Sequence, residues 1–306
     1  MIVLSEKILI VGAGRMGFGV IKTLISKGYQ VTVSDPSTEA VNRAVNIGAE
    51  ASADFNQVAV DHSIIIFSLP GPLQVKEMTE RMADLNVTHQ PIIIDLSTID
   101  PQTAIDAGQT CKLNGLRYIE APVSGGPGGA ESGTLSIMVG ADEGDYQQVK
   151  PVLNDIGKNI FYLGAIGTAS IAKICNNIVV ASTATILSEA FILASSGGIE
   201  PAKLKEILDN SVGGSKTLEV FGHHFVSGDF SKPTFALGLM HKDVGLFAEA
   251  IKQYGLTSLT GSLTCQIYNG ARAQGLEQED HTAICKYLEE MNNRKIDRSL
   301  AVEEVK

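Results

Sequence analysis

One short segment near the start of the chain constrains the fold more than any other. The apolar run 7–11 indicates a β-strand, and Gly12-Ala13-Gly14-Arg15-Met16-Gly17 follows it directly, before a helical run. In a Rossmann βαβ unit the first glycine makes the tight turn, the second lets the backbone approach a pyrophosphate, and the third lets helix and strand pack closely. The free N–H groups at the start of the helix favour an anion. The segment therefore predicts a dinucleotide-binding turn.

A carboxylate at the end of the second predicted strand bears on which dinucleotide is bound. Asp35 follows that strand eighteen residues after Gly17, near the ~20 expected for a ribose-binding carboxylate. It can accept both ribose hydroxyls of NAD but repels the 2′-phosphate of NADP, for which an arginine directly after the strand is expected. Pro36-Ser37 follow instead, and Arg43 lies about two helical turns away. The pattern favours NAD over NADP. The alternative to a dinucleotide site is a glycine-rich turn that binds no cofactor, beside an ordinary surface aspartate.

The first part of the chain alternates short β-branched runs with helical patterns, as in a parallel sheet covered by helices on both faces. Strands are predicted at 7–11, 30–34, 64–68, 91–96, 117–120, 135–139 and 159–162, the last three extending the same sheet around a Gly-rich loop at 125–129 and a helix near 143–156. After Gly167 the pattern is helical, and a helix over 168–195 would be ~42 Å long. We predict an α/β Rossmann-type N-terminal domain at 1–166 and an all-α C-terminal domain for substrate binding and oligomerisation at 167–306, which begins with this long connecting helix.

Composition and charge exclude several classes of function. The chain is 44% hydrophobic and 19% charged, as globular proteins are, and its formal net charge of -10 argues against nucleic acid or an anionic membrane as partner. The four cysteines form no C-x-x-C pair, so we expect reduced thiols. His223-His224 and His241 do not suggest a metal site, because adjacent histidines cannot easily face one ion and no matching carboxylate cluster is visible.

Two segments of the chain bear on export and membrane insertion. The first seven residues lack a charged n-region, a long apolar run and a small-residue cleavage site, so we expect a cytoplasmic protein. The apolar stretch 171–195 contains Lys173, Asn176, Asn177 and Glu189. Four polar residues in one segment favour a buried helix over a membrane span.

Three turns that follow predicted strands carry distinctive residues, at 68–70, 95–98 and 120–126. In open parallel sheets, ligands lie at the carboxyl ends of the strands. Ser124-Gly125-Gly126 can aim a hydroxyl and successive N–H groups at one anion, such as a substrate carboxylate. Proline and glycine also serve backbone geometry alone in such turns, and that reading stays open for each of them.

The predicted long helix carries two polar side chains on one face, since Lys173 and Asn177 are four residues apart. A lysine among Ile171, Ala172 and Ile174 is desolvated unless it faces a cleft, and desolvation lowers the pKa of an ammonium toward the range useful for proton transfer. A lysine that extends its ammonium to solvent fits the same position. The residues alone leave both readings open.

The whole chain resembles the β-hydroxyacid dehydrogenase family, which includes 3-hydroxyisobutyrate dehydrogenase and tartronate semialdehyde reductase. Six motifs carry the resemblance in order: 12–17 (GAGRMG), 95–101 (DLSTIDP), 121–126 (APVSGG), 133–135 (GTL), 173–177 (KICNN) and 242–243 (KD). The resemblance implies that Lys173 is catalytic and that Ser124, Gly125, Gly126 and Asn177 hold the substrate. It assigns the cofactor to Gly12, Ala13, Gly14, Arg15, Met16, Gly17, Asp35, Leu69, Pro70, Gln74, Thr98 and Lys242.

Some residues depart from the family pattern, and others separate it from its neighbours. Glu120 stands where Asp is usual, Gly71-Pro72 replace a more polar turn, and Pro127-Gly128-Gly129 add glycine beyond the substrate loop. The decarboxylating 6-phosphogluconate dehydrogenases carry a histidine where this chain has Asn176. Imine reductases do not keep a lysine at position 173, so the resemblance favours simple alcohol chemistry.

Together these observations predict an NAD-dependent oxidoreductase that converts a small β-hydroxy acid to its semialdehyde, or the reverse, with Lys173 as general acid/base. The alternatives are an NADPH-dependent semialdehyde or aldehyde reductase of the same fold, and a non-catalytic dinucleotide-binding module, against which Lys173 and Asn177 argue. Largely apolar helices at 178–193 and 244–251 predict a homo-oligomer. Family members are commonly dimers or tetramers.

Overall fold

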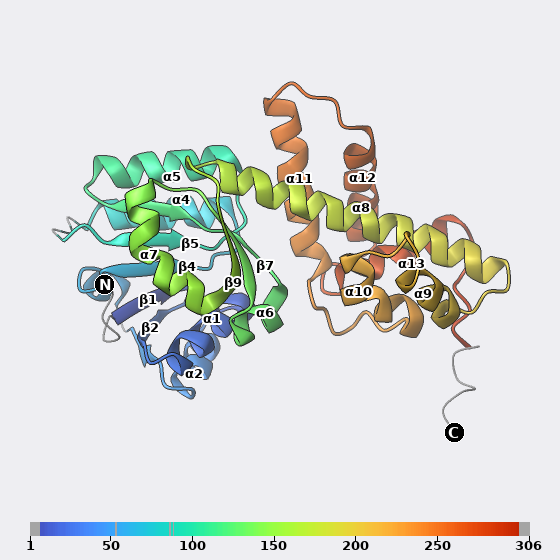
Figure 1. Ribbon diagram of the computed structural model, residues 1–306, viewed down its shortest axis with the longest axis horizontal. Coiled ribbons are helices and arrows are strands. Elements are labelled where there is room, and N and C mark those ends of the chain that lie inside the picture. The colour runs from blue at the N-terminus through green and yellow to red at the C-terminus, as the bar shows by residue number, and fades with distance from the viewer. Residues whose placement is uncertain (1–6, 53, 86, 88, 300–306) are drawn as a thin grey trace. The chain divides into compact units, whose positions relative to one another are not determined.

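The computed structural model describes residues 7–52, 54–85, 87 and 89–299. Their contacts divide the chain into two units, Met1–Lys173 and Ile174–Lys306. Helix α8 (Thr168–Ser196) crosses this division, so each unit holds part of it (Figure 1). The boundary predicted from the sequence lies at the start of the same helix, between residues 166 and 167.

The first unit is built on a six-stranded parallel sheet in the order β3-β2-β1-β4-β5-β6. Its strands are β1 (Lys7–Val11), β2 (Gln30–Ser34), β3 (Glu50–Ala51), β4 (Ile64–Phe67), β5 (Ile92–Asp95) and β6 (Arg117–Glu120). The central strands are runs of buried aliphatic residues, because both faces of the sheet are covered. Ser34, Val11, Phe67, Asp95 and Glu120 pair in register across the sheet, so these strands end along one edge.

Helices cover both faces of this sheet (Figure 1). Helices α1 (Arg15–Ser26), α2 (Thr38–Val45) and α7 (Glu143–Ile156) cover one face, and α3 (Phe55–Ala59), α4 (Pro72–Ala83) and α5 (Pro101–Leu113) cover the other. Alternate residues of β1 show the division, since Ile8 and Ile10 pack with α1 while Leu9 and Val11 pack with α4 and α5. The predicted Rossmann-type domain is confirmed.

The prediction that all later strands extend the first sheet is right for β6 and wrong for the other two. Strands β7 (Val123–Ser124), β8 (Leu135–Val139) and β9 (Gly157–Tyr162) form a separate three-stranded sheet. Between β6 and β7 lies Pro122, which has no N–H for a sheet ladder, and Glu120 meets Gly140 in an isolated antiparallel bridge. The predicted loop 125–129 is also partly helical, because α6 (Gly126–Ser132) begins inside it with Pro127 in its first turn.

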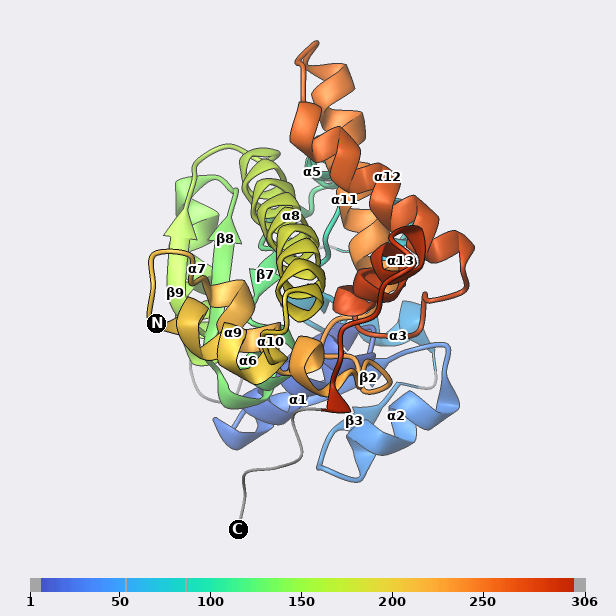
Figure 2. The ribbon, with the colours of Figure 1, turned by 90° about the vertical axis from the view of Figure 1, so that its right-hand side faces the viewer.

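Among its described residues the second unit contains helices joined by loops, and no strand (Figure 2). Besides its part of α8, it contains α9 (Pro201–Asp209), α10 (Lys216–Ser227), α11 (Leu237–Gln253), α12 (Leu259–Ala273), a 3-10 turn η1 (His281–Ala283) and α13 (Ile284–Met291). Its core includes stacked rings of Phe191 and Phe225, 5.1 Å apart, and the buried Tyr268. Helix α8 contributes Ala181 and Leu187 to this core.

Helix α8 is long and apolar enough, by length and composition alone, to cross a membrane. Core helices pass the same test, and half of the most apolar window of α8 is buried within the protein. Earlier in the same helix, the polar residues Lys173 and Asn177 are also buried. These observations favour the predicted core helix.

The four cysteines are free thiols, in agreement with the absence of a C-x-x-C pattern. Cys111 on α5, Cys265 on α12 and Cys285 on α13 are buried, whereas Cys175 on α8 is exposed. Burial raises the pKa of the Cys111 and Cys285 thiols to about 12.

Candidate active site

In the glycine turn after β1, the surroundings of each of the three glycines explain why glycine is needed or tolerated there. Gly12 has φ of 97°, and a Cβ there would collide with the carbonyl oxygen of Ser68; a Cβ on Gly17 would collide with the carbonyl of Gly12. A Cβ on Gly14 would meet no atom within 4 Å. The first and third glycines therefore serve the turn and helix packing, while the second faces open space in front of α1. This geometry fits the pyrophosphate of a dinucleotide.

Asp35 is held at the edge of that turn. Its Oδ2 accepts the N–H of Ala13 at 2.7 Å, and its Oδ1 accepts the N–H of Ser37 at 2.7 Å. A carboxylate offers about four lone-pair sites, so each oxygen keeps room for a ribose hydroxyl. The position agrees with the predicted role at the adenosine ribose.

Arg43 lies much closer to the turn than its place in the sequence suggests. Its Nη2 donates to the carbonyl of Ala13 at 2.8 Å, and its guanidinium lies 4.7 Å from the centre of the Phe18 ring. Although Arg43 lies about two helical turns beyond β2, its long side chain reaches back from α2 to the turn. The glycine turn thus has a carboxylate and a guanidinium bound to the same alanine.

The turns after β4 and β5 are tied together by side-chain hydrogen bonds. The N–H of Leu69 donates to Ser97 Oγ at 2.9 Å, and the N–H of Ser97 donates to Asp95 Oδ1 at 2.9 Å. The hydroxyl of Tyr118 donates to Asp95 Oδ2 at 2.7 Å. Burial and the Asp95 charge raise the pKa of Tyr118 well above its ordinary value. These hydrogen bonds hold the turn at Leu69 in place through Asp95, Ser97 and Tyr118. None of these three residues was assigned a role from the sequence.

The remaining predicted cofactor residues of this unit lie on or next to the same turns. Thr98 follows Ser97 and is half-buried, Pro70 follows Leu69 and is exposed, and Gln74 lies half-buried in the first turn of α4. Arg15 and Met16 open α1 directly after Gly14. The described structure therefore places all of them at the carboxyl edge of the sheet, although their contacts with a cofactor remain predictions.

The predicted substrate loop joins β7 to α6. Gly125 has φ of 125° and Gly126 has φ of 64°, which glycine adopts readily and other residues rarely do. Ser124 is half-buried and Gly125 is exposed. Successive left-handed glycines can direct neighbouring N–H groups outward, as the anion-binding prediction requires.

Glu120, noted above as a departure from the family pattern, anchors the start of α8. Its carboxylate accepts the N–H groups of Gly167 (2.5 Å), Ala169 (2.9 Å) and Ser170 (3.0 Å), and the Ser170 hydroxyl (2.5 Å). These N–H groups have no partner within the helix. Burial raises the pKa of Glu120 above 4.5, although the hydrogen bonds act in the opposite direction. Its donors come from nearly fifty residues later, so the sequence carried no signal for this contact.

Lys173 lies one helical turn after this anchor, on the buried face of α8. Its side chain is 7% exposed, and Ala169 and Ser170 precede it by four and three residues, the spacing of one helix face. A largely exposed, solvent-seeking lysine does not fit that burial. The position of Lys173 therefore depends on the same helical turn that Glu120 holds.

In the second unit, Asn177 and Lys242 meet the same carboxylate. Asn177 Nδ2 donates to Asp243 Oδ2 at 2.6 Å, and Lys242 Nζ lies 2.8 Å from Asp243 Oδ1. Asp243 is 1% exposed, whereas Lys242 is partly exposed. The motif Lys242-Asp243 was the available signal, but only the lysine was assigned a role from it.

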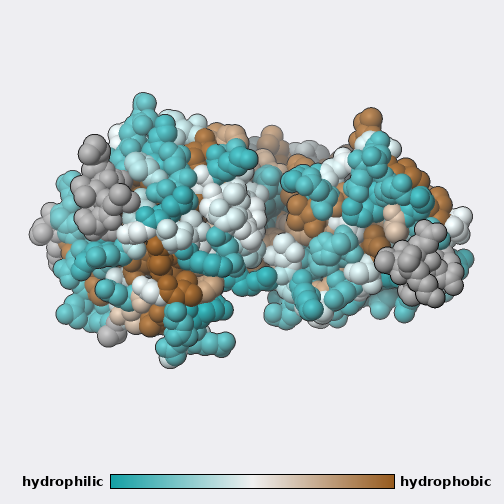
Figure 3. Space-filling model, turned by 60° about the horizontal axis from the view of Figure 1, so that its bottom comes forward, coloured by the Kyte–Doolittle hydropathy of each residue, from teal (hydrophilic) through white to brown (hydrophobic). Residues whose placement is uncertain are grey.

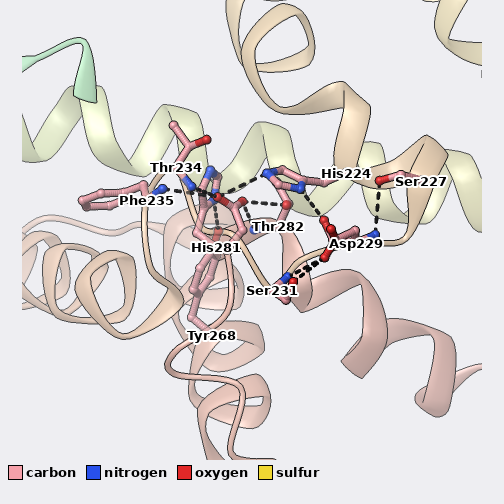
Figure 4. Close-up of polar contacts among 10 residues, drawn as sticks. His224, Ser227, Asp229, Ser231, Thr234, Phe235, Tyr268, His281 and Thr282 are labelled. Atoms are coloured by element: carbon pink, nitrogen blue, oxygen red, sulfur yellow. Dashed lines mark hydrogen bonds and ion pairs between the residues drawn. The ribbon is translucent and has the colours of Figure 1, made fainter. Parts of the chain in front are cut away.

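Of the three histidines considered above as metal ligands, only His224 belongs to a buried polar network, which also contains His281 (Figure 4). His223 is exposed, and His241 Nε2 lies 2.7 Å from Asn269 Oδ1. His224 Nδ1 lies 2.6 Å from the carbonyl of Asp229, and its Nε2 lies 3.5 Å from Asp280 Oδ2. His281 Nδ1 lies 3.0 Å from the hydroxyl of Tyr268. Among the described residues no group of three or more His, Cys, Asp or Glu side chains is arranged to hold a metal ion.

Two protein families match consecutive parts of the chain. The NAD-binding domain of 6-phosphogluconate dehydrogenase matches residues 7–164. The NAD-binding region of NADP-dependent 3-hydroxyisobutyrate dehydrogenase matches residues 167–288. The two matches agree with a dinucleotide-binding chain but name both forms of the cofactor.

Individual relatives match almost the whole chain. The 2-(hydroxymethyl)glutarate dehydrogenase of Eubacterium barkeri is 35% identical over 94% of this chain and 96% of its own length. The 2-hydroxy-3-oxopropionate reductase of Escherichia coli is 35% identical over 95% of this chain and 99% of its own. The solved structure of Mycobacterium tuberculosis 3-hydroxyisobutyrate dehydrogenase with L-serine has a TM-score of 0.84 at 28% identity, covering 93% of this chain and 99% of that one.

Proposed function

This chain belongs to the β-hydroxyacid dehydrogenase family, and from that premise we propose that it oxidises a small β-hydroxy acid to the semialdehyde with NAD, or catalyses the reverse reduction. The observation that carries the proposal is the buried Lys173, one turn beyond the helix start that Glu120 anchors. A buried amine on a rigid element is suited to proton transfer with a substrate hydroxyl. The relatives with matching sequences act, by their names, on hydroxy acids or the corresponding oxo acids.

Each proposed residue has one task. Neutral Lys173 accepts the hydroxyl proton during oxidation, and its ammonium form returns that proton during reduction. The N–H groups and hydroxyl of the loop 124–126 hold the substrate carboxylate, and Asn177, which Asp243 orients, is the further substrate contact. The bound nicotinamide supplies hydride chemistry. The glycine turn and Asp35 hold its adenosine diphosphate part.

We further propose that NAD is preferred over NADP, that the protein is cytoplasmic, and that it forms a homodimer or homotetramer. Asp35 supports the first, because a carboxylate repels a 2′-phosphate.

The proposed oligomer is supported by exposed apolar residues. Figure 3 shows hydrophobic patches among hydrophilic residues on one face of the chain. The exposed Val179, Ile186 and Leu193 recur every seven residues along α8 and so share one side of that helix. Light scattering that gives a monomer mass at micromolar concentration would refute the oligomer.

The test of the catalytic proposal is Lys173→Ala, with turnover followed by NADH absorbance. We expect kcat to fall by about 10²–10⁴-fold, the usual contribution of a general acid/base, while NADH binding is nearly unchanged. Lys22→Ala is the control, since Lys22 is an exposed lysine of the same unit paired with Glu131. If the Lys173 variant keeps more than about a third of wild-type turnover when chemistry limits the rate, the role assigned to it is wrong.

The same assay separates the alternatives. A higher kcat/KM with NADPH and a semialdehyde would favour the NADPH-dependent reductase, and dinucleotide binding without turnover of any hydroxy acid would favour a non-catalytic module.

The substrate carboxylate is tested separately. A 3-hydroxypropionate-like, 3-hydroxyisobutyrate-like or glycerate-like acid should have a higher kcat/KM than its methyl ester, by a factor that corresponds to roughly the 1.5–3 kcal/mol of a charge-assisted hydrogen bond. Equal turnover of acid and ester would exclude the carboxylate-binding loop.

A further inference from the structure

The environment of Asp35 contains a positive charge that a simple NAD-binding pattern lacks. Ala13, inside the glycine turn, donates its N–H to Asp35 and accepts a hydrogen bond from Arg43 at its carbonyl. Both charged side chains therefore contact a single residue of the turn. Phe18, the fourth residue of α1, packs its ring against the guanidinium, with the ring centre 4.7 Å from Arg43 Cζ. Arg43 is thus held by a hydrogen bond and by a cation–π contact.

This placement puts Arg43 beside the atoms that distinguish the two dinucleotides. A carboxylate at the end of the second strand of a Rossmann fold binds the adenosine 2′-hydroxyl, which is the position that carries the phosphate in NADP. A guanidinium has five N–H donors in a fork that matches phosphate oxygens. The described contacts of Arg43 use one N–H, toward Ala13. Because Arg43 and Asp35 both bond Ala13, their charges are close enough to act on the same ligand at ordinary ionic strength, where screening sets in over about 10 Å.

We propose that Arg43 is a cofactor-specificity residue, which attracts the 2′-phosphate and so reduces the discrimination against NADP that Asp35 alone would impose. The inference rests on the proposed function only in its dinucleotide cofactor. Asp35 favours NAD, and Arg43 keeps NADP as a usable second cofactor. Phe18 and Ala13 act as positioning residues, since they fix where the guanidinium stands.

The experiment compares NADH and NADPH affinity by titrating the fluorescence of the reduced nicotinamide in wild type, Arg43→Ala and Arg43→Met. The methionine keeps an aliphatic chain against Phe18 but removes the charge. We expect the dissociation constant for NADPH to rise about tenfold in both variants, as for loss of a charge-assisted hydrogen bond, and that for NADH to change less than about threefold. Added salt should shrink the difference, because Arg43 is exposed.

Arg81→Ala is the matched control. Arg81 also stacks on a phenylalanine, 4.5 Å from the Phe55 ring, and also donates one hydrogen bond, to Asn56 at 2.8 Å, but it lies on α4 and does not contact the glycine turn. Its loss should leave the ratio of the two affinities unchanged. A comparable change in the ratio for Arg81→Ala would contradict a local effect of Arg43.

The outcomes separate this inference from the proposed function. The wild-type ratio of affinities tests the NAD preference, whereas the change in that ratio on losing Arg43 tests the specificity role. Equal weakening of both cofactors would show that Arg43 only supports the turn, and no change in either would show that it does nothing there; each overturns the inference. Binding of neither dinucleotide by wild type would overturn both. Substrate identity does not enter, because the measurement needs no turnover.

Discussion

Two buried carboxylates, Glu120 in the first unit and Asp280 in the second, have matching hydrogen bonds but opposite pKa shifts. Among the described residues, each accepts three backbone N–H groups and one hydroxyl: Glu120 from Gly167, Ala169 and Ser170, and Asp280 from Thr234, Phe235 and Thr282. Both are at most 1% exposed. Yet the pKa of Glu120 is raised and that of Asp280 is lowered well below 3.8.

The difference lies in the cations that face each carboxylate. Burial raises the pKa of both, but His224 lies 3.5 Å from Asp280 and the adjacent His281 adds a favourable charge interaction. Glu120 has no salt bridge in the described part of the chain, and its donors are neutral. Four neutral donors therefore do not outweigh burial here, whereas the same donors with a histidine do. Three experiments test this comparison.

The largest effect is expected for Asp280→Ala. It removes the acceptor of four hydrogen bonds and leaves His224 beside a cavity, for which a loss of about 3–5 kcal/mol in the free energy of unfolding is typical. Urea unfolding at pH 7 measures it. Asp229→Ala is the control: the Asp229 carboxylate is exposed and, among the described residues, accepts hydrogen bonds from Ser231, so its removal should cost less than about 1 kcal/mol. A loss for Asp280→Ala as small as that for Asp229→Ala would show that the hydrogen bonds of Asp280 do not stabilise the folded protein.

A smaller effect is expected on acidification, through His281. Burial lowers the pKa of His281 from 6.5 to about 4, although the Asp280 charge opposes this. The unfolded chain then binds a proton that the folded chain excludes, so stability is full above pH 6.5 and falls as the pH drops toward 4, by about 3 kcal/mol at ~1.4 kcal/mol per pKa unit. His224 has a raised pKa and acts oppositely, since its contribution is present below 6.5 and lost as the pH rises above its folded value.

The measurement is urea unfolding of wild type and His281→Gln between pH 4 and pH 8. The variant has no titrating group at this position, so the difference in stability between the two proteins should shift in its favour as the pH falls below 6.5. A difference independent of pH would contradict the lowered pKa. His224→Gln provides the complementary case, with the opposite expected sign.

The smallest effect is expected for Glu120→Gln, at about 1–3 kcal/mol, because glutamine keeps one acceptor but turns an amide toward the donors of Ser170. A raised carboxyl pKa means that the Glu120 contribution is full below about 4.5 and is lost as the pH rises through the folded value. The cost of Glu120→Gln should therefore grow between pH 7 and pH 5. Hydrogen exchange at the first turn of α8 reports it, and a cost that shrinks over this range would refute the raised pKa.

The elements that could be predicted from the sequence are those whose pattern is local. The buried strands are continuous β-branched runs, and the glycine turn is recognisable because it lies between a strand and a helix. The family resemblance is confirmed by matches across the chain. Strand pairing beyond Pro122 could not be predicted, because the partner of a strand is not encoded in its own residues. The contact of Arg43 with the glycine turn could not be predicted for a related reason, since spacing along a helix fixes where the Cα lies but not where a long side chain reaches. Glu120 depends on donors that come nearly fifty residues later.

The cysteines make this chain a reporter of its own opening. A thiol reacts as the thiolate, so a brief exposure to an alkylating reagent modifies the exposed Cys175 at once and reaches the buried cysteines only when their surroundings open. Cys111 lies in the first unit, whereas Cys265 and Cys285 lie in the second. Peptide mass spectrometry after such a pulse, repeated at increasing urea concentrations, would give a separate unfolding curve for each unit of the unmutated protein. The two curves would show whether one unit unfolds while the other remains folded.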